Sequence, residues 1–474
     1  MRITRVDVKN WRILKNPQAE FRTPCAVIIG ENGSGKSTLI ELILSIFELV
    51  FKKMKDPKAI GDVDGFYLEY ETKDETGNLH QVAFESGYIE GSTPRELKIE
   101  IDDATYSIKE DGGEKLKALL PSNIIAYYAG DTERVEGICK YFVEENLDAV
   151  RKSGNDYTLS PLHLPIDVPF IYSDLYHLPI ALTSLLVGDG KSNVLEKLNL
   201  KPELVNVTVR LKKPHWATAG SGDFWGNSSQ LFNDFLRGLI DHSISTRNGD
   251  DFIETEVSAM NLRDYLEETG IAHRGVFLFQ IFDLLYNNGL LDYVDVSWKN
   301  KGTDADAISI EYFSEGEKQV IMTSALIEFW DKQHCLFLLD EPDTFLHPKW
   351  QSQFLPEVME NLKESQAIIT THSALMLSTM AEGSELFVMK DGQLMVYSES
   401  TYGMVAGDIM ETAMETAPRD NRVAALLEET ENDIEAGRMK EAKEKLAELE
   451  NTGVDRYDVN RLRSTIERYE LLGI

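Results

Sequence analysis

The chain has 474 residues, enough for two or three domains, and carries 80 acidic against 48 basic side chains, a formal net charge of −32. This balance disfavours a protein that coats DNA through its overall charge, because duplex affinity comes largely from basic groups, although a local basic groove is compatible with it. The three cysteines form no CxxC pair, so they predict neither a disulfide framework nor a zinc ribbon and favour the cytoplasm.

No segment has the pattern of a membrane anchor. The longest apolar stretch, residues 39–51, contains two glutamates and is shorter than the roughly 20 residues that a spanning helix requires. The first ten residues, MRITRVDVKN, contain no apolar core of a signal peptide. We therefore expect a cytoplasmic protein that does not bind a membrane.

Residues 1–135 are predicted to form a first α/β lobe. Apolar side chains alternate near the start, and CAVIIG at 25–30 predicts a buried strand that leads into a helix over about 36–53. Residues 65–110 have the alternation and turn residues of β-hairpins, and NIIAYYAG at 123–130 predicts another apolar strand.

The rest of the chain divides into three parts. Residues 136–305 contain helical fragments without sustained heptads and predict an inserted, mainly helical subdomain. Strands and helices alternate again over 306–402, which predicts a second α/β lobe with CLFLLD, QAIITTHS and SELFVMK as strands. Residues 403–474 predict a charged helical hairpin whose apolar side packs on its own lobe or, alternatively, docks a partner.

A phosphate-binding loop is predicted between the first buried strand and the first helix. GENGSGKST fits the pattern G-x-x-x-x-G-K-[ST] at the expected place, and a chance match of a Gly/Ser-rich turn is the weaker interpretation. Backbone N–H groups at such a helix start wrap phosphate oxygens. Lys36 would reach the outer phosphates of ATP, and Ser37 would hold Mg²⁺. The ATP-contacting residues of this loop are Gly30, Glu31, Asn32, Gly33, Ser34, Gly35, Lys36, Ser37 and Thr38.

A second acidic motif, CLFLLDEPD, places two carboxylates at the end of an apolar strand. Charges in such a place are costly unless they meet a cation or a polarised water. Asp340 is predicted to orient a Mg²⁺-bound water, and Glu341 is predicted to act as the general base for the attacking water. Taken alone, an acidic turn after a strand is equally common, but the phosphate loop favours the catalytic interpretation. His372, after the strand in IITTHSALM, is a candidate sensor of the terminal phosphate.

A polar, glycine-containing stretch, FSEGEKQ at 313–319, begins a predicted helix whose remainder is apolar. Ser314 is suited to cap this helix, with Glu317 completing a capping box. The stretch also resembles the signature sequence of ABC-type ATPases, which implies that Ser314, Gly316 and Glu317 contact an ATP held by a second copy. The two interpretations are compatible. The resemblance further implies an ABC-type ATPase head with split lobes, a site that includes Asp343, and catalysis by two copies arranged head to tail.

The long interval between Lys36 and Ser314 resembles the RecF, SMC and OLD-nuclease branch of these ATPases, and DEPDTFLHPKWQ is typical of OLD-like members. The chain more narrowly resembles the ATPase subunit of Septu-type or retron-associated anti-phage systems. This resemblance rests on three stretches, YYAGDTERVEGICKYF, RLKKPHW and NRLRSTIERYELLG. This implies a regulatory ATPase that forms a homodimer or higher oligomer, controls an HNH nuclease partner, and contacts DNA mainly through that complex.

Two features separate this chain from its presumed relatives. The Mg²⁺-contacting Gln of ABC-type ATPases is missing from NIIAYYAG, where Tyr128, Asp131 or Arg134 is expected to substitute. The tail is too short for the Toprim domain of OLD nucleases, and no HNH-like cluster occurs, so we expect no intrinsic nuclease activity. Alternative functions are a RecF-like DNA-repair ATPase that acts directly on DNA and a scaffold that binds nucleotide without hydrolysis. A transporter motor is the least favoured, because the insert occupies its coupling region.

Overall fold

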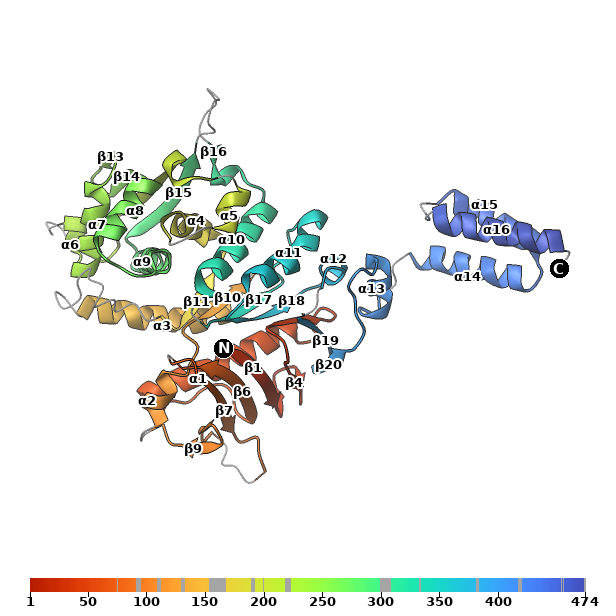
Figure 1. Ribbon diagram of the computed structural model, residues 1–474, viewed down its shortest axis with the longest axis horizontal. Helices are drawn as coiled ribbons and strands as arrows, with labels where there is room; N and C mark the ends of the chain where they lie inside the picture. The colour runs from red at the N-terminus through yellow and green to blue at the C-terminus, as the bar shows by residue number, and fades with distance from the viewer. Residues whose placement is uncertain are drawn as a thin grey trace. The chain divides into compact units, whose positions relative to one another are not determined.

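In the computed structural model the chain forms two compact units, Met1–Gly403 and Met404–Ile474 (Figure 1). The structure describes residues 1–474 except 75, 91–94, 109–111, 129–132, 153–167, 189–191, 199, 218–222, 299–307, 332–333, 381–382, 417–419, 453, 455 and 473–474. Within the described residues, no helix is both long and apolar enough to cross a bilayer.

A seven-stranded sheet with the order β11-β10-β17-β18-β5-β19-β20 forms the centre of the first unit. Its neighbouring strands are parallel except for the antiparallel pair β19 and β20. The strands β5, β17 and β18 are buried along their whole length, as expected for a parallel sheet with both faces covered. The carboxyl ends of the parallel strands therefore share one edge. The strands are β5 (Cys25–Ile29), β10 (Ile124–Tyr128), β11 (Phe170–Ser173), β17 (Leu336–Asp340), β18 (Gln366–Thr370), β19 (Ser384–Lys390) and β20 (Gln393–Tyr397).

The predicted hairpins form a second, antiparallel sheet with the order β4-β1-β6-β7-β8-β9. Helix α1 (Lys36–Lys55) packs against this sheet through Phe47, whose ring lies 5.9 Å from that of Tyr70 and 6.0 Å from that of Phe84. The same helix contacts β17 and β18. Contact with both sheets explains why α1 is apolar nearly all round. The strands are β1 (Arg2–Val8), β4 (Gln18–Glu20), β6 (Phe66–Lys73), β7 (Leu79–Ser86), β8 (Lys98–Ile101) and β9 (Ala104–Tyr106), and the small pair β2 (Asn10–Trp11) and β3 (Leu14–Lys15) lies between β1 and β4 in sequence.

The inserted segment is richer in helix than in strand, as expected, but it also contains an antiparallel sheet that the sequence analysis did not predict. The order of this sheet is β13-β14-β12-β15-β16. Val205, Val207, Val209 and Leu211 are buried on one face of β12, and this alternation in VNVTVRLK is the signal that the analysis missed. The strands are β12 (Val205–Lys212), β13 (Ser245–Asn248), β14 (Phe252–Ser258), β15 (Leu291–Trp298) and β16 (Ile308–Ser309).

Helices pack on these sheets and carry much of the apolar core (Figure 1). Phe279 of α9 and Trp330 of α10, both fully buried, meet with ring centroids 4.9 Å apart and join the insert to the second lobe. The helices of the first unit after α1 are α2 (Gly112–Lys117), α3 (Glu133–Lys152), α4 (Leu178–Val187), α5 (Asn193–Lys197), α6 (Asp223–Gly226), α7 (Gln230–Asp241), α8 (Ala259–Glu268), α9 (Arg274–Asn287), α10 (Glu315–Trp330), α11 (Pro348–Asn361) and α12 (Ala374–Leu377).

A buried ion-pair cluster around His177 fixes the turn between β11 and α4 to helix α9. The ring nitrogens of His177 lie 2.9 Å from Asp174 Oδ1 and 3.4 Å from Asp283 Oδ1. Burial alone would lower the pKa of His177, but the hydrogen bonds to the two carboxylates outweigh it and raise the pKa to about 9. The imidazole is therefore charged at neutral pH and stabilises the junction.

We expect His177→Gln to lower the free energy of unfolding by about 3 kcal/mol at pH 6 and by much less at pH 10. The folded pKa is raised, so the contribution of His177 is complete below its unfolded pKa of about 6.5 and disappears as the pH rises through the folded value. Urea unfolding of both proteins across this range measures the difference, with the exposed His215→Gln as control. A stability difference that stays constant with pH would contradict the assignment.

The second unit contains four helices, and three of them share one core where a hairpin of two helices was predicted. Gly437 lies between α14 and α15 and has a φ of 74°. Helices commonly end at a residue in this left-handed conformation, which glycine adopts easily. Ile434, Ala442, Leu446, Leu449 and Leu462 are among the residues of its buried core. The helices are α13 (Ala406–Thr412), α14 (Asn421–Glu435), α15 (Met439–Glu450) and α16 (Arg456–Leu472).

Leu449→Ala should destabilise this second unit by about 2–5 kcal/mol, because Leu449 is fully buried and its loss leaves a cavity. Hydrogen exchange followed by mass spectrometry on the full chain should then show faster exchange in α14, α15 and α16. Leu471→Ala is the matched control, since 89% of that side chain is exposed. Equal exchange in the two variants would argue against the core as described.

Candidate functional site

The phosphate loop joins the carboxyl end of β5 to the start of α1. Gly30 has φ of 155°, and a Cβ there would lie 2.2 Å from the backbone oxygen of Met389, so no other residue fits. Gly35 precedes the helix with φ of 117°. The first-turn N–H groups of α1 have no intrahelical partner, and this end of the helix favours an anion.

Lys36 turns back over this loop. Its Nζ donates hydrogen bonds to the backbone oxygens of Gly30 at 3.0 Å and Glu31 at 3.3 Å. Nζ also lies 2.7 Å from Nε2 of His372, which follows β18. Burial lowers the pKa of Lys36, while the carboxylates of Glu341 and Asp340 act to raise it. The structure thus brings the ammonium group into the space where the loop would hold phosphate.

Asp340 ends β17 and is only 1% exposed. Burial raises its pKa, and the nearby hydroxyls of Ser37 and Thr370 favour the charged form. Thr370 Oγ1 donates to Asp340 Oδ1, whereas Oδ2 is buried and makes no hydrogen bond with the residues described. A buried carboxylate oxygen without a partner beside a serine hydroxyl fits an oxygen-liganded cation, and Mg²⁺ is the ion that prefers such a set with phosphate.

Glu341 follows directly and has an unusual backbone, with φ of 48°. This conformation is held by its N–H, which donates to the backbone oxygen of Thr370 at 3.1 Å and to Thr370 Oγ1 at 3.0 Å. A left-handed conformation in a non-glycine residue costs energy and is typical of functional sites. The sequence analysis did not single out Thr370, although its place just before His372 in IITTHS was visible.

His372 connects Lys36 and Glu341 through one ring nitrogen. Nε2 lies 2.7 Å from Lys36 Nζ and 3.2 Å from Glu341 Oε1. Burial and the Lys36 charge lower the pKa of His372, while Glu341 opposes them, so the ring is neutral at pH 7. A single nitrogen either accepts from Lys36 or donates to Glu341, depending on the tautomer. The His372 ring can therefore be in one of two states, with Nε2 accepting from Lys36 or donating to Glu341, and a bound phosphate would favour one of them.

Tyr128, one of the three candidates to substitute for the missing glutamine, lies at the end of β10. Tyr128 pairs with Asp340 in the parallel register. Burial raises the pKa of Tyr128, and the charges of Asp340 and Glu341 raise it further, while the Ser37 hydroxyl lowers it. Its hydroxyl therefore faces the predicted Mg²⁺ residues. Of the two other candidates, Asp131 and the side chain of Arg134 lie outside the described residues.

Asp343 is buried in the turn after Glu341. Burial and the Glu341 charge raise the pKa of Asp343 to about 6, although a hydrogen bond with Thr371 lowers it. Gln351 of α11 fixes this turn, donating to the Asp343 backbone oxygen at 3.4 Å and accepting from the Ser373 hydroxyl at 2.9 Å. The turn thus links the two catalytic strand ends.

The signature residues form a complete capping box at the start of α10. Ser314 N donates to Glu317 Oε2 at 2.9 Å, and Glu317 N donates to Ser314 Oγ at 3.3 Å. Gly316 lies against the turn after Asp343, where a Cβ would be 2.8 Å from the Phe345 oxygen. Among the residues described, no hydrogen bond or ion pair joins Ser314, Gly316 or Glu317 to the phosphate loop of the same chain. Ser314 and Glu317 are exposed and are free to meet another molecule.

Two family models match this chain. Residues 1–159, which include the phosphate loop, match the family described as "AAA ATPase domain". Residues 228–378, which include the signature and the acidic strand end, match "AAA domain, putative AbiEii toxin, Type IV TA system". Each match covers less than half of the chain, and both describe ATPase-type domains.

Curated relatives include two retron proteins. The chain is 22% identical to "Retron Vc95 probable ATPase" of Vibrio cholerae serotype O1 biovar El Tor, across 92% of this chain and 83% of that protein. It is 30% identical to "Retron Ec83 probable ATPase" of Escherichia coli over 99 residues, which span 20% of this chain and only 18% of that relative. The chain is thus similar to two proteins that are each described as a probable ATPase.

Solved structures with similarity include an SMC head bound to the C-winged helix domain of ScpA, at a TM-score of 0.38 and 16% identity, covering 84% of this chain and 98% of that one. The recombination mediator protein RecF bound to a nucleotide is similar at a TM-score of 0.34 and 16% identity, with 84% of this chain and 98% of that chain covered.

Proposed function

We propose that this chain, an ATPase of the AAA type, binds and hydrolyses ATP between two copies and thereby controls a partner nuclease in an anti-phage defence system. The observation that carries the ATPase assignment is the convergence of Lys36, Asp340, Glu341 and His372 at one edge of the sheet, beside the glycine loop. These residues come from three separate segments. Their meeting beside an anion-binding helix start supports chemistry on a phosphate.

In this proposal the phosphates of ATP lie on the loop N–H groups, and Lys36 leaves its backbone partners to contact them. Ser37 and Asp340 would hold Mg²⁺, which supplies charge neutralisation at the phosphates. Glu341, with its 36% exposed carboxylate, accepts a proton from the attacking water. His372 then donates from Nε2 to phosphate, since Lys36 is no longer its partner.

The second copy supplies the start of its α10. Ser314 and the N–H groups that follow it would complete the phosphate contacts from the opposite side, and Gly316 keeps the backbone close to the turn at Phe345. Because the closed pair binds ATP better than the open one, ATP shifts the population between the two shapes. That shift is the signal passed to the partner.

The partner is proposed to be an HNH nuclease, and DNA would be contacted mainly through the complex. The resemblance to Septu-type and retron-associated ATPases supports this, as do the two retron relatives. Affinity purification of the chain, expressed together with its neighbouring genes and with or without ATP, should recover the nuclease in an ATP-dependent amount. Lys36→Ala should remove that dependence. Recovery of the chain alone, with tight salt-sensitive DNA binding, would favour the RecF-like alternative.

A further inference from the structure

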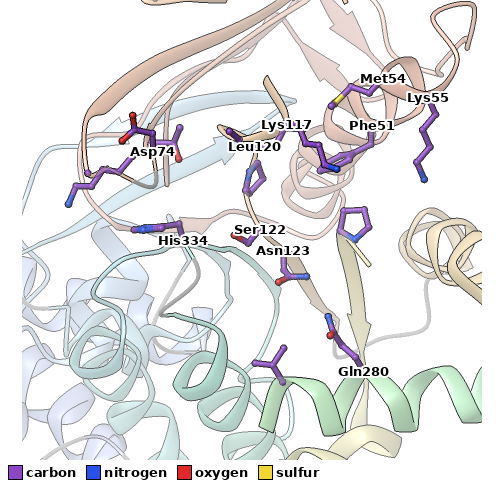
Figure 2. A pocket seen from close by; sticks show the side chains of 17 residues that line it. Phe51, Met54, Lys55, Asp74, Lys117, Leu120, Ser122, Asn123, Gln280 and His334 are labelled. Atoms are coloured by element: carbon purple, nitrogen blue, oxygen red, sulfur yellow. The ribbon is translucent and has the colours of Figure 1, made fainter. Parts of the chain in front are cut away.

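A pocket of about 920 Å³ lies at the edge of the seven-stranded sheet opposite the phosphate loop (Figure 2). Ser122 and Asn123 come just before β10, and His334 comes just before β17, so the pocket lies at the amino ends of strands whose carboxyl ends form the ATP site. Phe51, Met54 and Lys55 from the last turns of α1 form another wall. Its volume lies in the range of roughly 300–1,000 Å³ that is typical of small-molecule sites.

The charge of this pocket is the reverse of the charge of the chain. Three lysines line it, against one aspartate, whereas acidic residues dominate the whole sequence. Lys55 forms an ion pair with Glu145 at 2.6 Å, and Lys73 lies 4.0 Å from Glu364. Lys117 makes no hydrogen bond or ion pair with any residue described. Asp74 is occupied by its own turn, since its Oδ1 accepts from the backbone N–H groups of Thr76 and Asn78. Lys117 is therefore the lysine of this pocket that is open to an anion, with Lys55 and Lys73 beside it in ion pairs.

The remaining walls suit a flat ring with polar edges. Apolar and polar side chains share the surface about equally, and two amides lie beside the apolar ones. Asn123 Nδ2 donates to the Val168 oxygen at 2.8 Å, which leaves Oδ1 as an acceptor. Gln280 has no hydrogen-bond partner among the described residues, and Figure 2 shows it pointing toward Asn123. The apolar residues are Phe51, Met54, Leu120, Pro121, Pro169 and Val276.

We propose that this pocket is a second, regulatory site for a nucleoside phosphate, with the phosphate at the lysines and the base between the apolar wall and the two amides. Helix α1 connects the two sites, because it begins with Lys36 and ends with Lys55. Its 20 residues correspond to a rigid rod of about 30 Å. In this proposal α1 is the element that would link the two sites, and any effect of one ligand on the affinity of the other would be reciprocal.

The test uses the full chain with Lys36→Ala, which disables the phosphate loop. We expect this variant to keep one saturable site for fluorescent ADP, and Lys117→Glu added to it to weaken that site by about tenfold or more, because a charge-assisted hydrogen bond is lost. Lys58→Glu is the matched control, since Lys58 is exposed just beyond α1, changes the charge equally, and does not line the pocket. Thermal melting of each variant confirms that the fold is kept.

Two results would overturn the site: no ADP binding to the Lys36→Ala chain, or equal binding by the Lys117→Glu and Lys58→Glu variants. A parallel titration with a four-nucleotide DNA strand that carries a 5′ phosphate distinguishes the source of the ligand. Tighter binding of the strand identifies a strand end, and tighter binding of ADP identifies a free nucleotide. Hydrolysis by the unmodified chain is measured separately, so failure of this site leaves the proposed ATPase untouched.

Discussion

Glu341→Gln is expected to slow ATP hydrolysis by about 10²–10⁴-fold while two chains still pair in the presence of ATP. The amide keeps the shape of the side chain but does not accept the proton of the attacking water. The strained backbone should survive the change, because the hydrogen bonds that hold it run from the backbone N–H of Glu341 to Thr370. Phosphate release measures the first effect, and light scattering after gel filtration with ATP measures the second.

The matched control is Glu20→Gln, which removes an exposed carboxylate of β4 in the antiparallel sheet. It should hydrolyse ATP at the normal rate. Normal turnover by Glu341→Gln would show that another group takes the proton. Absence of hydrolysis in the unmodified chain, with ATP-dependent pairing preserved, would instead support the scaffold alternative.

The meeting of the candidate site residues was predictable because a parallel sheet brings the carboxyl ends of its strands to one edge. The glycine loop, Asp340, Glu341 and His372 each follow an apolar run, and this pattern alone predicts that they meet. The sequence did not reveal how they are held. Thr370 fixes both Asp340 and Glu341 through contacts that depend on the register of β17 and β18, which is a property of the sheet and not of either segment.

The two features that were not predicted, the sheet around β12 and the end of a helix at Gly437, both depend on contacts between distant segments. The alternation in β12 was readable, but its partners β14 and β15 lie far along the chain, and only their pairing makes a sheet. In the tail, Gly437 was visible within one long charged helical pattern, yet a glycine in a helix is often tolerated. What ended the helix there was the packing of α15 back on α14, a tertiary contact. Long-range pairing decided each case.

Because no hydrogen bond or ion pair among the residues described joins Ser314 to the phosphate loop of its own chain, we predict complementation between two inactive variants. Lys36→Ala and Ser314→Asp should each be inactive alone. In a head-to-tail pair of one chain of each kind, one site carries both changes and the other carries neither. Random pairing therefore restores about a quarter of normal hydrolysis, because half of the dimers are mixed and each has one intact site.

Ser314→Asp is chosen because Asp, like Ser, caps a helix, although it loses the hydrogen bond that Ser314 Oγ donates to Glu317 Oε2 at 2.7 Å. Its negative charge would instead oppose the phosphate across the dimer, and Ser314→Thr, which keeps the hydroxyl, should remain active. Phosphate release from each chain and from the equal mixture is the measurement. Full activity of Ser314→Asp would show that Ser314 acts only as a helix cap and does not contact ATP. Differently tagged chains show whether the subunits exchange. If they exchange and the mixture is still inactive, a site shared between copies is excluded, because the intact phosphate loop of one chain and the intact Ser314 of the other would have formed no working site.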